Sequence, residues 1–131
     1  MVDELKELLN RYEELAGIHA SIDYGDSRSV KRANDAVDEM ISISRDVSVM
    51  GEAGLNAFAA LLDVSTNKAN LWAAHHILEY MGFSKSLEQR ALGIIRENAK
   101  GESPDAFGEQ LWLRDWAEKH KQGASSPDAA A

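Results

Sequence analysis

The sequence has 131 residues and no cysteine, so it is long enough for one domain with its own core and can form neither disulfides nor a thiolate zinc site. Its 14 lysines and arginines against 22 aspartates and glutamates give a net charge of −8, which argues against non-specific binding of nucleic acid or anionic membranes. The acidic start, MVDELKELLNRYEEL, is unlike a secretory signal, and no apolar stretch approaches the length of a membrane span. We therefore expect a cytoplasmic protein.

A helical period of apolar residues dominates the chain and predicts an all-α fold of about six helices. The apolar stripe of the first helix comprises Leu5, Leu8, Leu9, Tyr12, Leu15 and Ala16. The sequence DYGDS ends this helix, and Asp26 or Ser27 is expected to cap the second, whose apolar side runs from Val30 to Val47. GLNAFAALLD (54–63) predicts a short third helix.

The second half of the chain predicts three more helices. VSTNKAN (64–70) predicts a turn into the fourth, and Gly82 is expected to end it in the left-handed conformation. The fifth begins near Ser84. Ser103 is expected to cap the sixth, with Pro104 at its first position, where the missing N–H costs nothing.

Small and polar residues dominate the end of the sequence, GASSPDAAA. The sixth helix is expected to run to about His120. We therefore predict a single helical domain, residues 1–121, and a disordered tail, residues 122–131.

Two adjacent histidines lie in the fourth helix, within NLWAAHHILEYMG. Because successive helical residues are about 100° apart, the apolar residues gather on one arc, and Trp72, His75, His76 and Glu79 fall in the opposite sector. We expect these four on a surface opposite the core. His75 and Glu79 are four residues apart, and a local hydrogen bond or ion pair is the simplest interpretation of that spacing.

A second histidine–carboxylate pair, His19 and Asp23, has the same spacing at the end of the first helix, and His19 is expected to be partly buried there. Together with His75 and Glu79 it offers the donor types of a metal site. The Glu-x-x-His pattern of ferritin-like sites is missing, as are a nucleophile elbow and a phosphate-binding glycine loop. We therefore predict no catalytic residue, metal or cofactor. A small metal-dependent hydrolase, or a metal-binding helical protein, that uses His19, His75 and Glu79 remains the alternative.

A surface for a protein partner is the favoured interpretation. Trp72 with its polar neighbours has the composition of a binding hot spot, the second helix carries an acidic stripe, and Trp112 shares a helix face with Trp116. The predicted partner-binding residues are Trp72, His75, His76, Glu79, Asp35, Asp38, Glu39, Asp46 and Trp112.

The order of short helix, tight turn and longer helix in residues 54–81 resembles a HEAT-type hairpin. The fifth and sixth helices read as a second, degenerate hairpin, and the first two helices as a cap. We expect these HEAT-like hairpins to form a small curved helical bundle or short solenoid. In such stacks the second helix of each pair lines the concave, partner-binding side.

A resemblance to a known family rests on Tyr12, His19, Gly51 and four blocks: YGDSRSVKRAND (24–35), ALLD (60–63), LWAAHHIL (71–78) and PDAFGEQLWLRDW (104–116). They resemble a bacterial family of small helical proteins catalogued as a domain of unknown function, similar to suspected immunity proteins found near polymorphic toxin loci. The resemblance implies the fold and a genomic context near toxins more than a mechanism. We expect a non-enzymatic inhibitor that neutralises a toxin by direct binding, and the acidic charge of the chain favours a basic nuclease as that toxin. A HEAT-like adaptor with another kind of partner is a further alternative.

Overall fold

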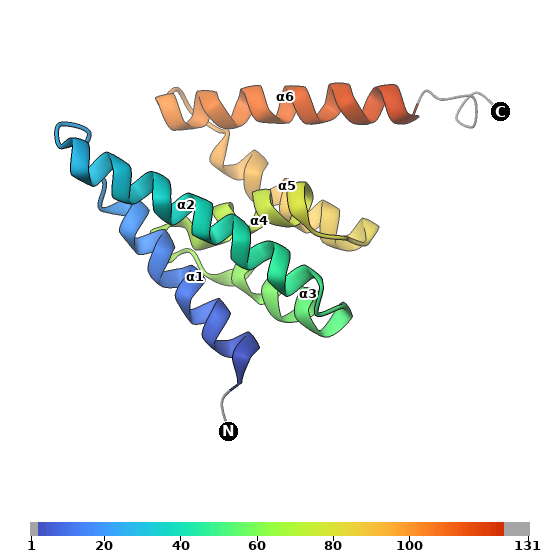
Figure 1. Cartoon of the computed structure of the whole chain (residues 1–131). Coiled ribbons are helices and arrows are strands. Elements are labelled where there is room, and N and C mark those ends of the chain that lie inside the picture. Colours follow the sequence, from blue (N-terminus) through green and yellow to red (C-terminus); the bar gives the residue numbers. More distant parts are fainter. Residues whose placement is uncertain (1–2, 125–131) are drawn as a thin grey trace. The chain divides into compact units, whose positions relative to one another are not determined.

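The computed structural model describes residues 3–124, with side chains to residue 120, and within that part of the chain all regular secondary structure is helical (Figure 1). The α-helices are α1 (Glu4–Ala20), α2 (Ser27–Ser48), α3 (Glu52–Ala59), α4 (Ala69–Tyr80), α5 (Lys85–Asn98) and α6 (Pro104–Ala124). Two short 3-10 helices, η1 (Ala60–Asp63) and η2 (Thr66–Lys68), link α3 to α4. The predicted all-α fold with six helices is confirmed. Within the described residues no helix has the length and apolarity needed to cross a membrane.

The chain forms two compact units, residues 1–94 and residues 95–131. Helices α1 to α4 and most of α5 belong to the first unit, whereas the end of α5 and all of α6 belong to the second. Helix α6 extends to Ala124, past the expected end near His120, and the rest of the predicted tail lies outside the described residues. The predicted single domain and its HEAT-like hairpins stay predictions.

Side-chain caps set four of the helix starts, and in α1 the cap is the Asp3 carboxylate, which accepts from the Lys6 backbone N–H at 3.2 Å. The Asp26 carboxylate accepts a hydrogen bond from the Arg28 backbone N–H at 2.9 Å. The Ser84 hydroxyl accepts from the Leu87 N–H at 3.1 Å, and the Ser103 hydroxyl from the Ala106 N–H at 3.0 Å. Each cap satisfies a backbone donor that has no partner inside its helix. The predicted starts of the second, fifth and sixth helices are therefore confirmed.

Two predictions about helix ends are wrong. Gly82 does not adopt the left-handed conformation, because the chain already leaves α4 at Met81, whose backbone is extended (φ −123°, ψ 158°). The predicted third helix begins earlier, at Glu52, and its last residues tighten into η1. Such 3-10 turns are frequent at the ends of α-helices.

The core of the first unit lies between α1, α2, α3 and α4. Its largest fully buried side chains are Tyr12, Phe58, Leu15, Met40, Ile77 and Val47. Helix α3 approaches the end of α2 very closely at Gly54. A Cβ atom at this position would overlap the Val47 carbonyl oxygen and lie 2.9 Å from Met50 Cβ, so only glycine fits there without displacing backbone.

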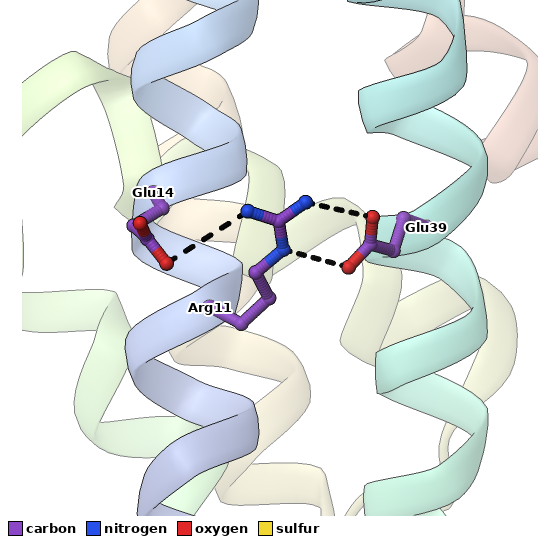
Figure 2. A network of polar contacts seen from close by, with 3 residues as sticks. All are labelled: Arg11, Glu14 and Glu39. Atoms are coloured by element: carbon purple, nitrogen blue, oxygen red, sulfur yellow. Dashed lines mark hydrogen bonds and ion pairs between the residues drawn. The ribbon is translucent and has the colours of Figure 1, made fainter.

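One ion pair bridges the outer sides of α1 and α2, which lie side by side (Figures 1 and 2). Arg11 donates from Nε to Glu39 Oε2 at 2.7 Å and from Nη2 to Glu39 Oε1 at 3.0 Å, and Arg11 Nη1 lies 3.8 Å from Glu14 Oε2. The hydrogen bond from Arg11 lowers the pKa of the Glu39 carboxyl. Because both side chains are over 40% exposed, the pair contributes at most about 1 kcal/mol to stability.

Candidate functional site

Trp72, His76 and Tyr80 stand four residues apart and form a row of rings along α4. Adjacent ring centroids in this ring row are 5.8 Å and 5.7 Å apart. At one end, His19 of α1 meets Trp72 edge-on at 4.8 Å. At the other end, the Arg45 guanidinium of α2 lies 5.0 Å from the centre of the Tyr80 ring. The ring row therefore faces α1 and α2, toward the interior of the first unit.

His76 is the most deeply placed member of the ring row, with only 3% of its surface exposed. A hydrogen bond of 2.6 Å joins its Nδ1 to the hydroxyl of Tyr12, which is completely buried. The Tyr12 ring also packs edge-on against Phe58 of α3 at 5.0 Å. One polar contact thus connects α1 and α4 at the centre of the core.

The Tyr12–His76 contact joins two neutral groups at pH 7. Burial lowers the pKa of His76 to about 4, and the nearby His75 adds to the effect. Burial also raises the pKa of the Tyr12 hydroxyl well above its ordinary value. Because a buried polar atom without a partner is costly, the contact serves the packing of the two helices.

The prediction of an exposed face on the fourth helix is wrong for His76 and incomplete for its neighbours. Trp72 and His75 are partly buried, and of the four predicted residues only Glu79 is exposed. Helical periodicity identifies one inward arc only for a helix at the surface of a protein. Helix α4 instead packs against α1, α2, α3 and η1, so residues opposite the apolar arc are also covered.

The residues of the alternative metal site contact other protein groups instead of converging on one point. His19 is partly buried, as predicted, and its ring contacts Trp72. The Asp23 carboxylate accepts a hydrogen bond from the Gly25 N–H at 2.9 Å within the turn between α1 and α2. Among the described residues, no three His, Asp or Glu side chains are arranged to hold a metal ion. The set His19, Asp23, His75 and Glu79 therefore does not form a ligand group in this structure.

The acidic stripe of the second helix lies on the surface of α2, and its four carboxylates are exposed. Two of them have cationic partners: Asp35 pairs with Lys31 at 2.9 Å, and Glu39 pairs with Arg11. Within residues 3–120, Asp38 and Asp46 form no ion pair with a cation. Two carboxylates of the stripe thus stay available for an external cation.

An exposed apolar side chain that the sequence reasoning missed lies at the end of the same side of α2. Val49 is 86% exposed and directly follows the helix in α-helical conformation. The angle of about 100° between successive residues places Val49 on the same arc as Asp35, Asp38 and Asp46. Val49 could therefore have been found in the sequence by continuing the helical spacing of α2 one residue beyond Ser48.

In the second unit, Trp112 and Trp116 stack with their ring centroids 5.3 Å apart, as their spacing on one face predicts. The His120 ring continues the stack at 3.7 Å from Trp116, and its Nδ1 lies 2.9 Å from the Trp116 carbonyl oxygen. Both tryptophans are partly buried. A role for Trp112 in binding a partner stays a prediction.

The chain matches no protein-family model, no curated protein and no solved structure. Function is accordingly inferred from the residues and their geometry. Within the first unit, the side of α2 that carries Asp35, Asp38, Asp46 and Val49 combines exposed charge with an exposed apolar group.

Proposed function

We propose that this chain is an inhibitor protein that binds and neutralises a basic toxin domain of the nuclease class. Its contact surface is the carboxylate row of α2, defined as Asp35, Asp38 and Asp46. The observation that carries the proposal is that Asp38 and Asp46 are exposed and, within the described residues, form no ion pair with a cation.

Charge complementarity supports a basic partner. A nuclease must attract the phosphates of its substrate, so it carries lysine and arginine side chains around its active site. The carboxylate row offers those cations an alternative anionic partner, and the net charge of −8 attracts them from a distance. Complementary charge of this kind speeds encounter and fixes orientation more than it raises final affinity.

Val49 offers the partner an apolar contact, which the carboxylate row cannot provide. Charged rims contribute little binding energy while they stay hydrated, and stable interfaces enclose apolar groups inside a polar border. Val49 is the most exposed large apolar side chain of the described residues, and it lies next to Asp46 on the same side of α2. We propose that it inserts between apolar atoms of the partner.

The resemblance to immunity proteins near toxin loci supports the choice of a toxin over another basic protein. Of the α4 residues predicted to bind the partner, Glu79 remains part of the proposal because it is exposed. His76 does not, because it is buried and bonded to Tyr12. Trp72 and His75 have a smaller part in the proposal, because both are partly buried.

The neighbouring gene provides the test. We expect it to encode a large secreted protein that ends in a small basic domain, and this domain is the probe. Replacing both Asp38 and Asp46 with lysine should slow association with the probe at least about tenfold at low salt, because attraction becomes repulsion along the row. Stopped-flow fluorescence at several salt concentrations measures this rate, and the salt dependence should become flatter.

A matched control separates local charge from net charge. Replacing Glu13 and Glu102, which are exposed and lie outside the row, with lysine also changes the net charge from −8 to −4, since each substitution adds two charges. This control should slow association by less than about threefold. Equal slowing by both double variants, or a neighbouring gene without such a domain, would count against the proposal.

A further inference from the structure

A pocket of about 400 Å³ lies between the end of α1 and the start of α2. One side of α1 and the first two turns of α2 form its walls. The lining residues are Glu14, Gly17, Ile18, Ser21, Ser29 and Arg32. A volume of this size lies within the range of small-molecule sites in proteins, about 300 to 1,000 Å³.

Small side chains and a fixed turn give the pocket its form. Ser21 and Ser29 are too short to fill the space between the two helices. The Ser29 hydroxyl accepts a hydrogen bond from the Asp23 N–H at 2.8 Å, which ties the turn to the first helical turns of α2. The position of Ser29 is thereby set before any ligand arrives.

Hydrogen-bond donors lie on the α2 side of the pocket. The Arg32 guanidinium carries five N–H groups, and among residues 3–120 it has no hydrogen-bonded or ion-paired acceptor. The Ser29 hydroxyl uses its oxygen to accept from Asp23, so its own proton stays available for donation. This side of the pocket therefore suits a carboxylate.

Acceptors lie on the α1 side. The Glu14 carboxylate is 3.8 Å from Arg11, whose shorter hydrogen bonds go to Glu39, so Glu14 is only weakly compensated (Figure 2). The Ser21 hydroxyl donates to the Gly17 carbonyl oxygen at 3.0 Å, which leaves its lone pairs free to accept. This side suits an ammonium group.

We propose that the pocket binds a small zwitterion, of the amino-acid or short-peptide class. Its carboxylate pairs with Arg32 and Ser29, and its ammonium group pairs with Glu14 and Ser21. The site has no residue in common with the carboxylate row, because none of Asp35, Asp38 and Asp46 lines the pocket. Binding of the zwitterion therefore does not depend on the toxin-inhibitor proposal.

The experiment titrates the isotope-labelled full chain with glycylglycine and follows backbone amide resonances. We expect saturable shifts at Gly17, Ser21 and Ser29 with a Kd of about 1 mM, as suits an open site with two charge contacts. Acetate and ethylammonium, which each carry one of the two charges, should bind at least about tenfold more weakly. Arg32→Gln and Glu14→Gln should each weaken glycylglycine binding by a similar factor.

Two charged residues outside the pocket serve as matched controls for Arg32 and Glu14. Arg28→Gln and Glu13→Gln remove the same charges from exposed positions outside the pocket and should leave the Kd within about twofold. All four variants should keep the circular dichroism of the wild type. No saturable shift below about 50 mM, equal binding of acetate, or equal weakening by the control variants would overturn the proposal.

Discussion

Tyr12→Ala is expected to lower the free energy of unfolding by about 4 kcal/mol, because it empties a fully buried ring position and leaves His76 Nδ1 without its partner. Tyr12→Phe keeps the ring and its contact with Phe58 but removes the hydroxyl. We expect it to cost about 1 to 2 kcal/mol. The difference between the two variants separates the packing of the ring from the hydrogen bond.

Urea unfolding followed by tryptophan fluorescence measures both values, with Tyr24→Ala as the control. Tyr24 is 80% exposed, so its removal should change the free energy of unfolding by less than about 0.5 kcal/mol. If Tyr12→Ala and Tyr24→Ala have similar effects, the Tyr12 ring does not lie in the core and the arrangement of α1 against α4 is wrong.

Acidification should destabilise the protein through His76 by about 3 kcal/mol between pH 7 and pH 4. The pKa of this histidine falls from its ordinary 6.5 to about 4 in the folded chain. Between these values the unfolded chain binds a proton that the folded chain does not, so stability decreases as the pH falls. Above pH 6.5 this contribution to stability is fully present.

The groups around His76 explain why its protonation is unfavourable. Aromatic rings surround His76: Tyr12 of α1 bonds to it, and Trp72 and Tyr80 of its own helix lie beside it. Phe58 of α3 packs behind the Tyr12 ring. The neighbouring His75 adds a charge of the same sign when it is protonated. Beyond the ring row, Arg45 of α2 over Tyr80 and His19 of α1 against Trp72 bring further cationic or ionisable groups.

The pH effect is measured as the difference between the wild type and His76→Gln, because carboxylates also titrate in this range and cancel in the comparison. The free energy of unfolding of the wild type should decrease more steeply between pH 6.5 and pH 4.5 than that of the variant. His75→Gln, one residue away and less buried, should keep most of the steeper slope. Parallel slopes for the wild type and His76→Gln would show that His76 does not titrate as a buried group.

Local signals predicted the helices well because they act within a few residues. Asp26, Ser84 and Ser103 each bond a backbone N–H two or three residues onward, so the sequence alone reveals them. The end of α4 was mispredicted at Gly82, because glycine permits the left-handed conformation but does not impose it.

The burial of His76 was not predictable from its own helix. Its partner, Tyr12, is 64 residues away in sequence, and its coverage depends on how α1, α2 and α3 surround α4. The same limit applies to Glu39, which periodicity assigned to the acidic stripe but which Arg11 of another helix neutralises. The exposure of the acidic stripe on α2 was predictable from its periodicity, whereas the pairing of side chains on different helices required the fold.

The inhibition of the neighbouring basic domain's nuclease activity tests the proposed function most directly. With enzyme and chain at concentrations well above their Kd, we expect cleavage of a nucleic-acid substrate to fall linearly with added chain and to end near one equivalent. The variant with lysine at positions 38 and 46 should reach the same inhibition at least about tenfold more slowly after mixing, because the carboxylate row mainly speeds association. Undiminished cleavage at a severalfold excess of the wild-type chain would contradict the proposal.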